Sequence, residues 1–159
     1  MTTRIREIAI IKAVLAAVVF VIMLITFRRT IPLIVSVLDL LAVPVYLWAA
    51  RRWPVTATYL AIAETALALT PRQFVQGYVN GINWVLYLPL PFAAAYVIGS
   101  RRALVRATIL VTGISAPIML LAALTLPAHI ERGELLTLVA YLLVVLWGIT
   151  WLGSRVLKE

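Results

Sequence analysis

The fold class of this chain is decided by residues 31–52, which read IPLIVSVLDLLAVPVYLWAARR. The stretch is almost wholly apolar up to its closing pair of arginines, and about 20 such residues are enough for a helix to cross a hydrocarbon core of about 30 Å. The one acidic residue inside it is Asp39. A charged side chain at the bilayer centre costs about 2.5–3.5 kcal/mol, so this carboxylate needs a partner, a proton or an ion.

The same apolar character extends over the whole chain of 159 residues, of which 64% are hydrophobic and 13% charged. The mean hydropathy is +1.07, whereas a soluble domain has about 45–50% apolar and roughly 25% charged residues. We therefore predict an all-α, polytopic integral membrane protein with a single transmembrane domain over residues 1–159. A prokaryotic plasma membrane is the expected location, because the chain is short and carries no targeting extension.

About six transmembrane helices are expected from the lengths of the apolar runs. The predicted spans are 8–27, 31–50, 54–70, 84–98, 103–126 and 135–152. The fourth is short and contains Pro89 and Pro91. Five full spans plus a re-entrant segment are therefore the alternative.

The basic residues set the predicted orientation. With a cytoplasmic N-terminus and six spans, ten of the 14 Lys and Arg residues fall on the inner side and four on the outer side. Both termini are therefore predicted to be cytoplasmic. The net charge of +8 is explained by this topology and by contact with the lipid bilayer, and we expect no nucleic-acid partner.

A second carboxylate, Glu64, lies within the third apolar run. Counting 1.5 Å per residue from the outer ends of the spans places Asp39 roughly 12 Å and Glu64 roughly 9 Å deep. If the second and third spans pack as a hairpin, the two carboxylates can face each other. At least one of them should then hold a proton near neutral pH unless a cation is bound.

Other polar residues cluster around these two carboxylates. Ser36 and Tyr46 share the helix face of Asp39, and the connection over residues 71–83 supplies Gln76, Asn80 and Asn83. Together these residues predict a polar pocket that opens outward and binds a solute or ion of unknown identity. In the structural alternative Asp39 pairs with Arg28, Arg29 or Arg72 and the amides are ordinary loop polarity.

Two further features lie within apolar runs. Gly113 and Pro117 in the fifth span predict a helix break or a proline kink, because proline cannot donate to the carbonyl of residue 113. Lys12 lies four residues into the first predicted span, so we expect its ammonium to reach the headgroups.

Ala9, Ala13 and Ala17 form a ladder at four-residue spacing on the first predicted helix, which favours close packing within the protein or with a partner. With this ladder the chain resembles the substrate-binding S component of energy-coupling-factor vitamin transporters, which are also small six-helix proteins with an inside N-terminus. The resemblance implies an outward pocket and a docking face on the first helix. The chain departs from that family in its very short first outer loop.

The leading functional prediction is a small membrane transport component. The alternative is a non-catalytic accessory or scaffold subunit of a larger membrane complex, with other membrane subunits or a homo-oligomer as partners. An intramembrane enzyme acting on a lipid is a third hypothesis, since an Asp–Glu pair can do acid–base chemistry. The chain has no cysteine and a single histidine, so no metal site or cofactor is expected.

Overall fold

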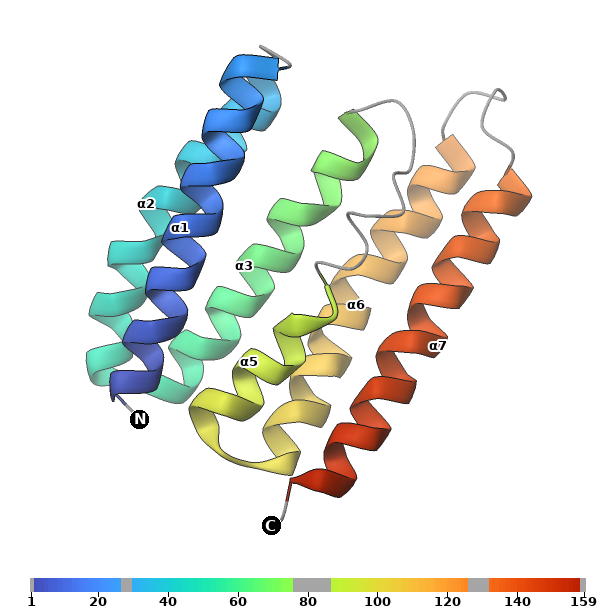
Figure 1. The fold of residues 1–159 in the computed structure, drawn as a ribbon. Coiled ribbons are helices and arrows are strands. Elements are labelled where there is room, and N and C mark those ends of the chain that lie inside the picture. The colour runs from blue at the N-terminus through green and yellow to red at the C-terminus, as the bar shows by residue number, and fades with distance from the viewer. Residues whose placement is uncertain (1, 27–29, 76–86, 126–131, 158–159) are drawn as a thin grey trace. The chain divides into compact units, whose positions relative to one another are not determined.

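The computed structural model describes residues 2–26, 30–75, 87–125 and 132–157 (Figure 1). Within these ranges the regular elements are all helices, which confirms the all-α prediction. The helices are α1 (Thr2–Thr26), α2 (Thr30–Arg52), α3 (Pro54–Val75), α5 (Pro89–Ile98), α6 (Arg101–Thr125) and α7 (Arg132–Val156).

Three stretches of described helix are long and apolar enough to cross a membrane. They are Leu33–Arg52 in α2, Arg101–Leu121 in α6 and Val139–Val156 in α7. Large apolar side chains stay exposed on these helices, with Leu41 60% exposed and Val144 71% exposed. Exposed apolar surface of this kind is typical of a face that meets lipid or another protein. The number of crossings and the orientation stay predictions.

Two helices extend beyond the apolar runs that predicted them. α1 begins at Thr2 rather than at residue 8, since Arg and Glu in its first turns are good helix formers although they are not apolar. α3 begins at Pro54 as predicted but continues to Val75, past Pro71. A proline removes one amide donor, and here the backbone stays helical beyond it. Hydropathy locates the apolar part of a helix and not its ends.

The fourth predicted span is represented by α5, which has 10 residues. At 1.5 Å per residue α5 is roughly 15 Å long, about half of a hydrocarbon core, so this helix alone cannot cross a bilayer. Residues 84–86 of the predicted span lie outside the described residues. The re-entrant alternative stays a prediction.

The chain divides into two compact units, Met1–Ala61 and Ile62–Glu159, with the boundary inside α3. In the first unit α1 packs along α2; in the second, α5 packs on α6 and α6 on α7 (Figure 1). Each unit therefore has its own helix–helix seam. A single transmembrane domain stays a prediction.

Short turns join neighbouring helices. Trp53 alone separates α2 from α3, and its amide donates to the carbonyl of Ala49 at 2.8 Å. Between α5 and α6, Gly99 adopts a left-handed conformation with φ of 75°, which favours glycine because a Cβ atom would clash there. Ser100 then caps α6, because its hydroxyl accepts a hydrogen bond from the amide of Ala103 at 3.1 Å.

Candidate functional site

The seam between α1 and α2 is lined by small and polar side chains. The buried residues of these two helices are Ile5, Ala9 and Ala16 on α1, and Ser36, Asp39, Tyr46 and Ala50 on α2. Their spacing of three, four or seven residues places each set on one face of its helix. Alanine and serine at these positions let two helix backbones approach closely, as in membrane helix pairs.

An ion pair crosses this seam. The Nζ atom of Lys12 lies 3.3 Å from Oδ1 of Asp39, and the two side chains are only 13% and 8% exposed. The pair therefore joins α1 to α2 through two charges that are largely withdrawn from solvent. Each charge removes most of the cost that the other would meet alone in an apolar setting.

This pair corrects the prediction that Lys12 reaches the headgroups. Its ammonium lies against the carboxylate of Asp39 on the neighbouring helix, and the Lys12 side chain is largely withdrawn from solvent. Asp39 thus pairs with a lysine of α1. Arg28 and Arg29, its partners in the structural alternative, lie outside the described residues, and a pairing with Arg72 stays a prediction.

Two more polar side chains lie along the same face of α2. Ser36 is fully buried one helical turn from Asp39, and Tyr46 is 6% exposed about two turns away on the other side. The phenol oxygen of Tyr46 makes no hydrogen bond of good geometry with the described residues. The Thr58 hydroxyl lies beside it but donates to the carbonyl of Pro54 at 2.8 Å. Tyr46 therefore lies next to α3, and its phenol oxygen keeps unused hydrogen-bonding capacity.

Glu64 lies on the part of α3 that belongs to the second unit, whereas Asp39 belongs to the first. Its side chain is half-buried, and the hydroxyl of Thr65 donates to its Oε2 atom at 3.5 Å. The predicted approach of Asp39 to Glu64 stays a prediction. The amides expected above them, Gln76, Asn80 and Asn83, lie outside the described residues.

The helix assignment is not interrupted at Gly113 and Pro117, and a proline kink there stays a prediction. α6 is one continuous helix from Arg101 to Thr125 with Pro117 inside it. Hydroxyl groups accompany the proline: Ser115 donates to the carbonyl of Val111 at 2.7 Å, and the hydroxyl of Thr112 has no partner among the described residues. A missing amide donor at residue 117 removes one backbone hydrogen bond without ending the helix. Gly113 is exposed on α6.

The alanine ladder faces α2 only in part. Ala9 is buried, Ala13 is half-buried and Ala17 is exposed, whereas Ala16 is 3% exposed. Eight residues rotate about 80° around a helix of 3.6 residues per turn, while seven residues return to within about 20° of the starting face. Ala9 and Ala16 therefore form the seam, and Ala17 points away from it.

A different kind of seam lies in the second unit, and sequence reasoning did not predict it. The hydroxyls of Thr108 on α6 and Thr150 on α7 are 2.8 Å apart and buried. Gly153 supports the same packing, because a Cβ atom there would lie 2.7 Å from the ring of Phe92 on α5. In the sequence this seam is indicated only by threonine and glycine at near-helical spacing, and that pattern is a weak predictor of helix packing.

The described residues offer one chemical feature beyond packing. They contain no cluster of three or more His, Cys, Asp or Glu side chains that could hold a metal ion. The Lys12–Asp39 pair is different, since a proton or cation can take the place of the ammonium at the carboxylate. An anionic group can in turn take the place of the carboxylate at the ammonium.

No family model, curated protein or solved structure matches this chain.

Proposed function

We propose that this protein is a small membrane transport component whose working site is the Lys12–Asp39 pair. The observation that carries the proposal is the 3.3 Å ion pair between two apolar helices. Ionisable residues within membrane segments commonly mark the paths of ions, protons or substrates. The proposed cargo is a proton, a cation or a small charged solute.

The depth of Asp39 along α2 supports this role. Within the apolar stretch Leu33–Arg52, Asp39 is six residues from one end and thirteen from the arginine end. These separations correspond to roughly 9 Å and roughly 20 Å. With Arg51 and Arg52 on the cytoplasmic side, Asp39 would lie in the outer half of the bilayer, where an ion arriving from outside could reach it.

The pair also supplies a mechanism for coupling. As long as Lys12 and Asp39 are joined, α1 and α2 are held at one seam. A proton or cation bound at Asp39 would neutralise the carboxylate and leave the Lys12 ammonium without its counter-charge. The energetic cost of an unpaired charge in an apolar setting would then favour separation of the two helices. Binding of the proton or cation would in this way drive a movement of α1 against α2.

Flux measurements in proteoliposomes test this proposal. Purified full-length protein is reconstituted with a pH-sensitive dye inside, and proton entry is driven by a potassium gradient with valinomycin; a parallel sample follows labelled sodium. We expect flux of one of these cations in the wild type and its loss in Asp39→Asn. Thr108→Val, which alters a buried polar group in the second unit, is the matched control and should keep the flux.

Normal flux through Asp39→Asn would overturn the proposal. The accessory-subunit alternative predicts another pattern: no flux of either cation in the wild type, and co-purification from the native membrane with larger subunits in a fixed ratio. Native mass spectrometry of the tagged protein measures that ratio directly.

A further inference from the structure

The second unit carries a cluster of positive charge at one end, formed by Arg101, Arg102 and Arg106 on α6 and Arg155 on α7. All four side chains are exposed. The first three occupy the first two turns of α6, and Arg155 lies in the last turn of α7. We call these four residues the basic cluster.

The ends of α6 and α7 that carry the basic cluster lie together (Figure 1). A Cβ atom built at Gly153 on α7 would lie 3.3 Å from the side chain of Leu104 on α6. Leu104 is within one turn of Arg101, and Gly153 is two residues from Arg155. The packing therefore brings arginines from the start of one helix and the end of the other to a common surface.

The basic cluster has no acidic counterpart among the residues that the structure describes. The ion pair between Lys12 and Asp39 belongs to the first unit. In α6 and α7 the acidic residue is Glu134, which lies in the first turn of α7, at the opposite end of that helix from Arg155. Among the described residues of α5, α6 and α7, no acidic residue therefore lies at this end of the unit.

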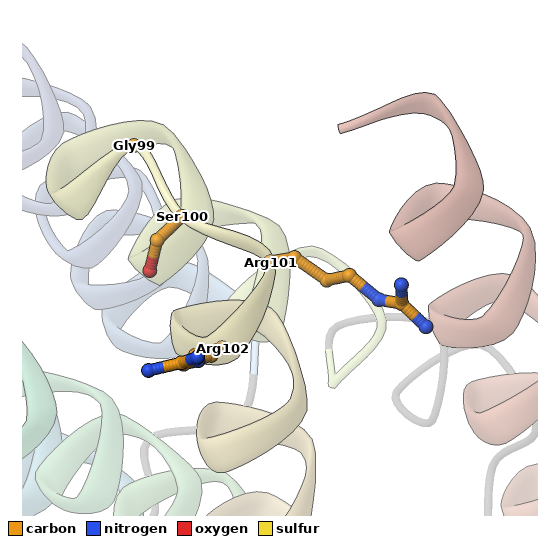
Figure 2. A pocket seen from close by; sticks show the side chains of 4 residues that line it. All are labelled: Gly99, Ser100, Arg101 and Arg102. Carbon is orange, nitrogen blue, oxygen red and sulfur yellow. The ribbon is translucent and has the colours of Figure 1, made fainter. Parts of the chain in front are cut away.

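The turn between α5 and α6 shapes this surface. Gly99, Ser100, Arg101 and Arg102 line a shallow depression, and the two arginines point to different sides of the turn (Figure 2). Arginine presents a planar fork of donors that suits phosphate oxygens. The Ser100 cap already takes up one of the first amides of α6, so the arginines, and not the helix end alone, would hold an anion here.

Amphipathic aromatic residues adjoin the basic cluster. The guanidinium of Arg155 lies 4.2 Å from the ring centroid of Trp151, and Trp151 is 55% exposed. Further along the helices the outward surface becomes apolar, with Ile109 54% exposed and Val144 71% exposed. Tryptophan between a basic and an apolar surface is typical of the level of the lipid headgroups.

We propose that the basic cluster binds anionic phospholipid, with Arg101 and Arg102 each contacting lipid phosphate on its own side of the turn. The acyl chains would run along the apolar surface of α6 and α7. The arginine guanidinium groups can bind phosphate, and an apolar surface adjoins them. This combination fits a lipid better than a free anion, because a free anion would make no contact with the apolar surface. This inference does not depend on what the Lys12–Asp39 pair transports.

The chain contains a matched comparison for this site. Arg51 and Arg52 are also consecutive and exposed, and Arg52 lies 5.2 Å from the ring centroid of Trp53. They occupy the last turn of α2, where carbonyl groups point outward and the helix dipole disfavours an anion. Arg101 and Arg102 occupy the first turn of α6, where the dipole favours one. Removing two charges from Arg101 and Arg102 should therefore weaken the binding of an anionic lipid more than removing two charges from Arg51 and Arg52.

Native mass spectrometry of the full-length protein in detergent micelles tests the proposal. The protein is titrated with an equimolar mixture of phosphatidylglycerol and phosphatidylcholine of identical acyl chains. We expect the wild type to retain phosphatidylglycerol preferentially. Arg101→Gln/Arg102→Gln should reduce that preference by about fivefold for each arginine removed, whereas Arg51→Gln/Arg52→Gln should change it less than twofold.

Several outcomes would overturn the proposal. These are an unchanged preference in Arg101→Gln/Arg102→Gln, and an equal loss in both double variants, which would indicate a general effect of charge. A further arm adds inorganic phosphate at millimolar concentration. If phosphate binds as well as the anionic lipid and displaces it, the site takes a free anion. Circular dichroism melting checks that both variants fold, as expected for exposed side chains.

Discussion

The two units of this chain hold their helices together by different means. In the first unit a lysine and an aspartate meet across the seam between α1 and α2. In the second, two threonine hydroxyls and a glycine lie between α6 and its neighbours. Hydroxyl groups can be buried in an apolar setting at small cost and are indifferent to pH, whereas a charge pair is costly to bury and responds to protons and ions. The difference indicates that the seam between α1 and α2 is the one whose packing can respond to a bound proton or ion.

The comparison is tested most strongly by removing one charge from the first seam. Asp39→Asn removes the carboxylate that pairs with the Lys12 ammonium, and we expect a loss of about 3–5 kcal/mol in the free energy of unfolding. Lys12→Met should cost a similar amount. Unfolding of the purified protein in mixed micelles, followed by circular dichroism, measures both.

The control for these variants is the double variant Lys12→Met/Asp39→Asn. Since no unpaired charge remains, most of the lost free energy should be recovered. If each single variant unfolds at the wild-type midpoint, the pair does not stabilise the seam and the comparison fails.

An intermediate effect is expected at the glycine of the second seam. Gly153→Val would place side-chain atoms against the ring of Phe92 and the side chain of Leu104, with the first Cβ contact at 2.7 Å. We expect destabilisation of about 1–3 kcal/mol. Gly148 lies on the same helix with open space around its Cβ position, so Gly148→Val should change the midpoint little. Equal effects of the two substitutions would show that close packing at Gly153 is unimportant.

The smallest effect is expected at the threonine pair. Thr108→Val removes the 2.8 Å hydrogen bond to Thr150, and hydrogen bonds between membrane helices are worth about 0.6 kcal/mol on average. The double variant Thr108→Val/Thr150→Val should lose no more than the single variant. If Thr108→Val lowers the free energy of unfolding as much as Asp39→Asn does, the two seams do not differ in the way described here.

Much of the fold could be predicted from composition and run length. The helix around Asp39 was expected over residues 31–50 and is observed over Thr30–Arg52. The start of α3 at Pro54 was also predicted, because proline suits the first position of a helix. The start of α1 was not, since Arg4 and Arg6 read as flanking charges when helices are located by hydropathy alone.

The site was harder to predict than the fold. That Asp39 needs a partner followed from its apolar surroundings, but the identity of that partner depends on how α1 lies against α2, which the sequence does not fix. The Thr108–Thr150 contact depends on how two helices rotate against each other, which small polar residues in an apolar sequence do not fix.

Cation flux through the double variant Lys12→Met/Asp39→Asn is the most direct test of the central claim, that the ion pair is a working site and not only a clamp between α1 and α2. If its unfolding midpoint shows the recovery expected above, loss of flux cannot be attributed to unfolding. The proposed function predicts a stable protein without proton or sodium flux in proteoliposomes whose wild-type counterparts transport one of them. Flux at the wild-type rate through the double variant would contradict it.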